Sequence, residues 1–261
     1  MTNEMQQNVG MEERKMTTIN GFLMLFVALA LLAAAAASFF MIGGGAGIAL
    51  CVVLFIVDCF VLGGFAVIRP NEAMVLTLFG KYSGTIKGEG FYWYNPFCSP
   101  VRYGKSSKIS LKAMTLESGQ QKINDELGNP VMIGIVVIWR VTNTAKAVFD
   151  VDDYEDYLAT QSDAALRSIV RQYPYDGFNN DAEKSLQGSS QEVADRLKEE
   201  IQSKVHIAGL EILEARITHL AYAPEIASAM LQRQQAAAII DARAMIVDGA
   251  VGMVEMALEE L

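Results

Sequence analysis

The sequence predicts an α+β protein that is anchored in a membrane by an N-terminal helical hairpin and ends in a long helix. The chain has 261 residues, 52% of them hydrophobic, and the excess lies between Gly21 and Ile68, where only Asp58 is charged at neutral pH. From Asn71, short apolar runs alternate with turn residues and then give way to helical patterns, an order typical of α+β domains. From Pro224, apolar residues recur at spacings of four and three, which is the repeat of a coiled coil.

Two membrane spans are expected after a cytoplasmic segment at residues 1–20. Gly21–Ile42 is a run of 22 residues without a charge. As a helix it would be about 33 Å long, which matches a hydrocarbon core of about 30 Å. The glycine-rich stretch 43–47 predicts a turn, and Ile48–Ile68 is long enough to cross again. Residues 21–68 are therefore expected to form a hairpin of two transmembrane helices.

Basic residues predict the orientation of this hairpin. Arg14 and Lys15 precede the first span, Arg69, Lys81 and Lys87 follow the second, and the connecting turn has none. Basic residues favour the cytoplasmic side, so the protein is expected in the cell membrane with both ends in the cytoplasm. Alternatively, the first span is a signal peptide with a cleavage site at residues 35–37. The second span would then still leave the soluble domain in the cytoplasm.

Asp58 is the candidate polar site within the membrane. A carboxylate at that depth costs about 2.5–3.5 kcal/mol on insertion scales, so Asp58 is expected to face protein or to be protonated. It then belongs to an ion path or to a polar contact between protomers. The alternatives are a tolerated residue at a helix–helix contact and a span that lies shallow in the membrane.

The soluble domain is expected over residues 69–223, beginning with strands. β-Branched and aromatic residues between turn signals predict them at Glu72–Phe79, Phe91–Tyr94, Lys108–Leu116 and Val131–Val141. Turns are expected at Gly80-Lys81 and at residues 88–90. The aromatic residues Phe91, Tyr92, Trp93, Tyr94 and Phe97 would lie at the membrane interface or in the sheet core, and the two interpretations are compatible.

Two helices and a strand complete this domain. The first helix, capped by Asp152 or Asp153, is expected to run to about Arg171. The second is capped by Ser190 and carries an apolar stripe at Val193, Leu197, Ile201 and Val205. Gly209 is expected to end it, and Leu210–Leu220 returns to strand. The acidic run 150–156 departs from the calcium-binding EF-hand template, and helix capping explains it better.

Residues 224–261 predict a heptad-patterned helix through which copies of the chain associate. The apolar positions of its seam that we expect to carry oligomerisation are Ile226, Met230, Ile240, Val247, Val251, Val254 and Leu258. Arg233 is the one charged position in the repeat. The alternative is a single amphipathic helix that packs on its own domain.

Composition and motifs give no sign of catalysis. The formal charge of −9 and the absence of clustered basic residues disfavour nucleic acid. His206 and His219 have no Cys or His partner at zinc spacing, and no phosphate loop, nucleophile elbow or dinucleotide fingerprint occurs. No catalytic, cofactor-binding or metal-binding residues are therefore expected. A Ser–Lys dyad stays open, because its members would meet only in space. The three cysteines are expected to be small apolar residues, with palmitoylation as the alternative.

Several segments resemble the SPFH superfamily, also called Band 7, whose members include stomatins, prohibitins, flotillins and bacterial modulators of membrane proteases. The resemblance covers about residues 69–261 and is carried by Pro70–Ala73, Leu78–Tyr82, Gly90–Trp93, Val131–Val141, Asp163–Arg167, Ala221–Ile226 and Met230–Ala236. It implies a membrane-bound oligomeric scaffold that organises lipid domains or regulates membrane proteases and channels. Two departures are the second span and the short helical tail.

Two functions follow as expectations, with a catalytic membrane protein as a third. The first is a scaffold whose partners are other copies of the chain and membrane lipids. The second is a regulatory subunit that binds a membrane protease or transporter. Large homo-oligomers from purified protein would favour the first, and co-purification with a protease at a fixed ratio would favour the second.

Overall fold

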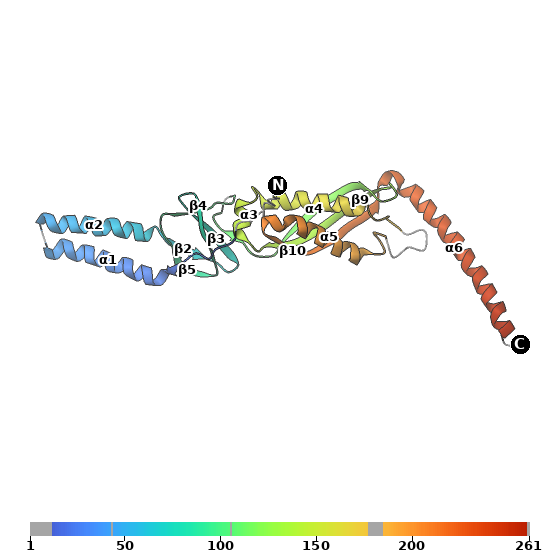
Figure 1. Cartoon of the computed structure of the whole chain (residues 1–261), viewed down its shortest axis with the longest axis horizontal. Coiled ribbons are helices and arrows are strands. Elements are labelled where there is room, and N and C mark those ends of the chain that lie inside the picture. Colours follow the sequence, from blue (N-terminus) through green and yellow to red (C-terminus); the bar gives the residue numbers. More distant parts are fainter. Residues whose placement is uncertain (1–11, 43, 105, 177–184, 260–261) are drawn as a thin grey trace, which may run out of the picture. The chain divides into compact units, whose positions relative to one another are not determined.

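The computed structural model describes residues 12–42, 44–104, 106–176 and 185–259, which divide into two compact units (Figure 1). Unit 1 comprises residues 1–114, 139–158 and 204–211, and unit 2 comprises residues 115–138, 159–203 and 212–261. Five elements that are described below, β8, β9, α4, α5 and β10, contribute residues to both units.

Unit 1 begins with the two apolar helices α1 (Gly21–Ile42) and α2 (Gly44–Leu62), which pack side by side (Figure 1). One sheet has the order β1-β5-β2, formed by Ile19–Asn20, Gly90–Trp93 and Phe65–Ile68. A second sheet has the order β4-β3-β6, with β7 also pairing with β3, formed by Lys81–Lys87, Glu72–Leu78, Cys98–Pro100 and Ile109–Ser110. The two sheets share a small core of Ala66, Ile68, Met74, Leu76, Ile86, Tyr94 and Cys98.

The first helix matches the sequence prediction, but the limits predicted for the second span are wrong. Helix α2 begins at Gly44, so residues 44–47 are helical and not a turn, while residue 43 lies outside the described residues. The helix stops at Leu62 and residues 65–68 form strand β2. A glycine makes this break possible. Gly64 accepts a hydrogen bond from the Tyr94 backbone N–H at 2.9 Å, and a Cβ at Gly64 would overlap the carbonyl oxygen of Tyr94.

The hairpin of β3 and β4 is predicted only in its first half. Strand β3 lies where the sequence places it, whereas β4 was not predicted, because its sequence KYSGTIK is polar and contains a glycine. The turn falls at Phe79 and Gly80, which both have left-handed φ angles, of 48° and 82°. This is one residue earlier than the predicted Gly80-Lys81 turn.

Unit 2 is built on a three-stranded sheet of order β10-β9-β8, formed by Leu210–Tyr222, Pro130–Val141 and Met114–Asn124. Alternate residues of β9 are buried: Val131, Ile133, Ile135 and Val137. Strands β9 and β10 confirm the predictions at Val131–Val141 and Leu210–Leu220. The predicted strand Lys108–Leu116 is wrong in its extent. Strand β7 covers only two of its residues, and β8 begins at Met114 and continues to Asn124. The polar run Glu117–Asn124 shows no apolar pattern, so this part of β8 was not predicted.

Helices α4 (Tyr154–Val170) and α5 (Ser190–Val205) lie along this sheet (Figure 1). Asp153 caps α4 as predicted, since its Oδ1 accepts hydrogen bonds from the N–H groups of Glu155 and Asp156 at 2.9 and 3.1 Å. Ser190 is the first residue of α5 and not the cap that precedes it. The predicted stripe is confirmed, because Val193, Leu197, Ile201 and Val205 are at most 2% exposed.

A short helix and a turn in unit 1 complete the domain. Helix α3 (Thr144–Phe149) was not predicted, since six residues are too few to show a period. Asn143 caps it by accepting a hydrogen bond from the Lys146 N–H at 3.0 Å. Gly209 ends the 3-10 helix His206–Ala208 with a φ of 66°, in agreement with the break predicted there.

Candidate membrane and assembly surfaces

Helices α1 and α2 present apolar side chains outwards along their whole length. Gly21–Met41 and Gly44–Leu62 are both long and apolar enough to cross a membrane. Large side chains such as Phe26, Phe40 and Met41 are 75%, 82% and 86% exposed. A core helix of a soluble protein would bury these groups, so their exposure fits lipid contact.

Small residues are the buried ones along α1 and α2. Ala28, Ala35 and Ser38 on α1 and Gly47 on α2 are buried, while Gly21 at the start of α1 lies against the Phe91 ring of β5. Small side chains let membrane helices approach closely. Ser38 is buried without loss, because its Oγ donates to the Ala35 carbonyl oxygen at 2.7 Å.

Asp58 is buried on α2 as well. It is 1% exposed, and its Oδ1 has no hydrogen-bond partner among the described residues. Asp58 is as far from the start of α2 as Ala28 is from the end of α1, so in an antiparallel hairpin the two residues lie at similar depth.

We expect Asp58→Asn to be mild and Asp58→Lys to be disruptive. Asparagine keeps the size of the side chain, whereas lysine must fit a longer charged chain between two close helices, at a cost of about 1–3 kcal/mol for overpacking alone. Membrane level and thermal stability in detergent measure the difference. Normal membrane level and stability of the lysine variant would contradict the buried position and favour a shallow span.

Aromatic residues join the ends of the two helices to the first sheet. The indole Nε1 of Trp93 donates to the Val61 carbonyl oxygen in the last turn of α2 at 2.8 Å, and the same oxygen also accepts from the Gly64 N–H at 3.2 Å. Phe91 stacks on Phe65 with ring centroids 5.2 Å apart and meets Phe22 of α1 edge-on at 5.3 Å. Tyr94 is buried in the core, as one sequence interpretation of this cluster expects, while Phe97 is exposed and its place at the membrane interface stays a prediction.

The segment before α1 pairs with strands that follow α2. The Met16 N–H donates to the Thr85 carbonyl oxygen at 3.0 Å, and the Thr85 N–H donates to the Arg14 carbonyl oxygen at 2.8 Å. Further along, β1 pairs antiparallel with β5, with Ile19 opposite Trp93. The segment at residues 14–20 is therefore part of the soluble fold, which no pattern in the sequence indicated.

Glu13 joins this segment to Lys87 and Thr144 through both of its carboxylate oxygens. Oε2 accepts from Lys87 Nζ at 2.5 Å, and Oε1 accepts from the hydroxyl of the buried Thr144 at 2.6 Å. Gly84 allows the approach, because a Cβ there would lie 3.0 Å from the Met16 Cα.

The C-terminal helix α6 (Pro224–Glu259) confirms the predicted helix, but its apolar surface is wider than one seam. Of the seven predicted oligomerisation residues, Ile226 and Met230 are half-buried. The other five are 51–67% exposed: Ile240, Val247, Val251, Val254 and Leu258. Residues outside the seam are equally exposed: Ile239, Met245, Ile246, Met253 and Met256. In this structure residues 239–258 leave their apolar side chains exposed, and whether they pack on another copy or on their own domain stays a prediction.

Acidic residues interrupt this apolar surface along one line only. Asp241, Asp248 and Glu255 recur every seven residues. Beside them, Ile246, Val247, Ala250, Val251 and Val254 surround a hollow of about 420 Å³ whose edge is Glu255. Positions i, i+3, i+4 and i+7 of a helix form the hole that receives a side chain from a partner helix, and Val247, Ala250, Val251 and Val254 have this spacing.

Side-chain hydrogen bonds join the first turns of α6 to other parts of unit 2. Lys122 Nζ on β8 donates to Glu225 Oε1 at 2.6 Å, and this hydrogen bond holds the pKa of Glu225 below its usual value. Gln234 Nε2 donates to Asp176 Oδ2 at 2.7 Å. The helix is thus held near its start, while the residues that follow are exposed.

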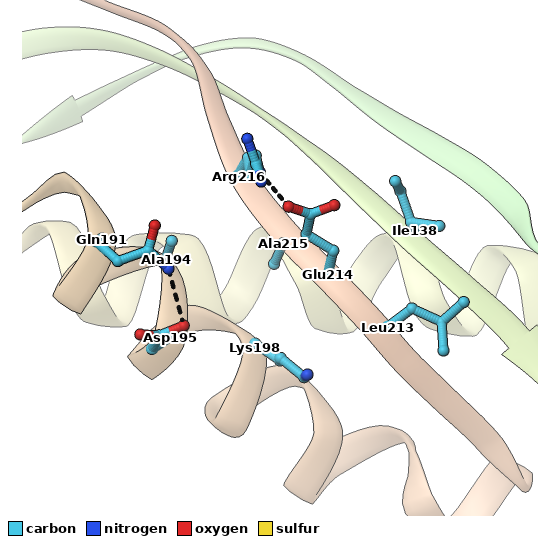
Figure 2. Close-up of a pocket in the computed structure, with 9 residues that line it drawn as sticks. All are labelled: Ile138, Gln191, Ala194, Asp195, Lys198, Leu213, Glu214, Ala215 and Arg216. Carbon is cyan, nitrogen blue, oxygen red and sulfur yellow. Dashed lines mark hydrogen bonds and ion pairs between the residues drawn. The ribbon is translucent and has the colours of Figure 1, made fainter.

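A groove of about 430 Å³ lies in unit 2 beside α5 and β10 (Figure 2). It is lined by Ile138, Gln191, Ala194, Asp195, Lys198, Leu213, Glu214, Ala215 and Arg216. Figure 2 shows the Glu214 carboxylate turned towards Arg216, with which it forms an ion pair, and Gln191 donates to Asp195 at 3.2 Å. Its polar lining consists of Gln191, Asp195, Lys198, Glu214 and Arg216.

Metal ligands do not gather in the described part of the chain. No group of three or more His, Cys, Asp or Glu side chains among these residues could hold a metal ion. His206 is exposed and His219 is half-buried. Cys98 is buried, Cys51 is half-buried and Cys59 is exposed.

The amino-acid sequence is similar to one protein-family model and to several known proteins. Residues 66–247 match the family model described as SPFH domain / Band 7 family. The chain is 31% identical over 121 residues to "Modulator of FtsH protease HflK" of Escherichia coli strain K12, which is 46% of this chain and 27% of that protein. It is 26% identical over 132 residues to an uncharacterized protein of Archaeoglobus fulgidus, covering 51% of each. The match therefore spans about a quarter of the bacterial relative and half of the archaeal one.

Proposed function

The chain belongs to the SPFH domain / Band 7 family, and on that premise we propose that it is a membrane-anchored scaffold that assembles with copies of itself. The exposed apolar surface of α6 supports this proposal most. Ten large apolar side chains between Ile239 and Leu258 are at least 51% exposed. Apolar surface this extensive marks an interaction site, and the hollow beside Val247 has the spacing that a second helix would fill.

The oligomer is the direct test of this function. The protein extracted in mild detergent is expected to run as a homo-oligomer, and electron microscopy of the purified particles would give its size and symmetry. A monodisperse monomer at micromolar concentration would contradict the scaffold.

We propose that both ends of the hairpin lie in the cytoplasm. Pairing of residues 14–20 with β4 and β5 supports placing the two ends on one side of the membrane, and Arg14, Lys15 and Arg69 support the cytoplasmic side. The pairing also disfavours signal cleavage at residues 35–37, because cleavage would remove the paired segment and most of α1.

Topology reporters test this orientation. A reporter fused after Leu261 is expected to report the cytoplasm, and one inserted at Gly44 is expected to report the opposite side. The insertion at Gly44 is suitable because a Cβ there meets no atom within 4 Å. A cytoplasmic signal from Gly44, or an external signal from the C-terminus, would overturn the hairpin orientation.

A regulatory subunit of a membrane protease is the second candidate function. It is favoured by the similarity to the bacterial relative, which is named as a modulator of a protease. Such a subunit would bind its protease at a fixed ratio. Cross-linking in cells followed by purification of the chain tests this, and a preparation that holds copies of this chain alone would favour the scaffold.

A further inference from the structure

Strand β8 lies at an open edge of the sheet in unit 2. The sheet has the order β10-β9-β8, so among the described residues β8 pairs with a strand on one side only. An edge strand of 11 residues offers a row of backbone N–H and C=O groups to which another strand can pair. Edges of this kind bind extended peptides as an added strand, and pockets beside the strand select the peptide's side chains.

A groove of about 280 Å³ runs along this edge. Its lining consists of residues 116–121 of β8 together with Ala159 and Asp163 of α4, so one wall is the edge strand and the other is a helix. We refer to these residues as the β8 groove. Residues of a strand are about 3.3 Å apart, so the strand wall is about 17 Å long and matches an extended peptide of about six residues.

Side-chain hydrogen bonds hold the two walls together. Ser118 Oγ donates to Asp163 Oδ1 at 2.7 Å, and Gln121 Nε2 donates to Ser118 Oγ at 3.3 Å. Arg167, one turn after Asp163 on α4, donates from Nη2 to Gln121 Oε1 at 3.0 Å. The groove is therefore formed without a partner, and such preorganisation lowers the entropic cost of binding.

Gly119, within the strand wall, has no explanation in the fold itself. Its φ is not left-handed, and a Cβ at this position would meet no atom within 4 Å. Glycine weakens the interior of a strand, and it often marks a site where a ligand or another backbone approaches closely. The open space at Gly119 therefore suits a chain that lies along β8.

The charges of the β8 groove favour a basic partner. Its charged lining residues, Glu117 and Asp163, are both acidic. Lys122, which follows the strand wall, forms an ion pair with Glu225 instead. The formal charge of −9 attracts cationic segments to the whole protein. In the cytoplasm, the segments that flank the spans of membrane proteins carry an excess of Lys and Arg.

We propose that the β8 groove binds an extended basic segment of a partner membrane protein, which adds a strand to the sheet beside β8. This rests on the cytoplasmic orientation proposed above, where such segments are found. Main-chain hydrogen bonds to β8 supply the affinity, and Glu117 and Asp163 supply the preference for Lys and Arg side chains. The protein would then hold a membrane partner by the part of its chain that leaves the bilayer.

Fluorescence anisotropy with synthetic peptides tests the proposal. The full chain in mild detergent is titrated into a labelled peptide of about six residues that alternates Lys and Val, and saturable binding is expected. A peptide that alternates Glu and Val is expected to bind at least about tenfold more weakly. Absence of binding by the Lys-Val peptide would overturn the proposal.

Methylated peptides separate strand pairing from attraction between charges. Two Lys-Val peptides are methylated on one or the other set of alternate backbone nitrogens, which keeps the charges and removes those donors. Only one set can face β8, so one of the two peptides is expected to bind at least about tenfold more weakly than the other. Equal binding by both would mean that no strand is added, and would overturn the proposal.

Gly119→Val fills the space beside the strand wall without harm to the fold. Valine suits a strand and meets no atom there, so the thermal midpoint is expected to equal or exceed that of the parent. The affinity for the Lys-Val peptide is expected to fall at least about tenfold. A variant that is folded and binds this peptide as the parent does would place the peptide outside the groove.

Glu117→Lys is expected to shift the preference towards the Glu-Val peptide. Glu199→Lys is the matched control, because it makes the same change in net charge at an exposed position of α5 outside the groove. It is expected to bind as the parent does, and equal losses in the two variants would overturn the proposal. So would slow hydrogen exchange of the β8 edge amides in the peptide-free oligomer, since a second copy would then cover this edge. Failure of the proposed orientation is seen separately with the topology reporters and leaves peptide binding in detergent unchanged.

Discussion

The double variant Val247→Glu, Val254→Glu is expected to dissociate the oligomer while unit 1 and the sheet of unit 2 stay folded. Both valines are 60% exposed on α6 and border the hollow beside Ala250. Each valine buries about 1.5–3 kcal/mol of transfer free energy when fully covered. A free-energy change of about 1.4 kcal/mol corresponds to a tenfold change in affinity. Loss of the burial of both valine side chains therefore predicts that the association constant falls at least about a hundredfold. Size-exclusion chromatography with light scattering measures it.

The control for this variant changes two charges on the acidic line of α6. Asp241 and Asp248 are exposed and lie outside the hollow. Asp241→Asn, Asp248→Asn is therefore expected to assemble almost as the parent does. If the seam variant assembles equally well, association depends on the strands or the membrane helices, and α6 has another role.

Gly64→Ala is expected to lower the stability of unit 1 by about 1–3 kcal/mol or more. A Cβ at Gly64 would overlap the Tyr94 carbonyl oxygen and lie 2.7 Å from the Trp93 Nε1. That indole caps the last turn of α2 through its hydrogen bond to Val61. One methyl group would therefore disturb both the start of β2 and the end of the helix. The thermal midpoint in detergent is expected to fall by roughly 5 °C or more.

The neighbouring glycine is a matched control. A Cβ at Gly63 would have its nearest neighbour at 3.5 Å, which is ordinary contact. Gly63→Ala is therefore expected to leave the midpoint nearly unchanged. Equal effects at the two positions would show that helix propensity at the end of α2, and not the close approach of Tyr94, sets the cost.

Periodic segments were the predictable part of this fold. The limits of α1, the stripe of α5 and the run of β9 follow from composition and spacing, because burial imposes a regular pattern on such elements. Strand β2 escaped prediction because an apolar strand directly after an apolar helix shows no change of composition. Strand β4 and most of β8 escaped because polar edge strands carry no alternation that one sequence can show.

The candidate sites divide in a similar way. Asp58 was predicted because one charge in an apolar run is conspicuous. The extent of the apolar surface on α6 was underestimated, since a heptad template scores two positions of each seven and ignores residues such as Ile246. The β8 groove and Glu13 were missed because their roles depend on contacts across many residues, which no local pattern encodes.

The pairing of residues 14–20 with β4 and β5 constrains the order in which the chain folds during synthesis. These residues are made before either apolar helix, yet Ile19 and Asn20 find their partners only when Trp93 and Tyr92 have emerged. Between the two lie both apolar helices, so this contact closes a long loop, and such contacts form late. Until then the edge of β5 that β1 will occupy stays open to other strands. Slow insertion of the helical hairpin into the bilayer would keep this strand edge exposed for longer and would favour aggregation. The rate of membrane insertion and the rate at which the first sheet closes are therefore coupled.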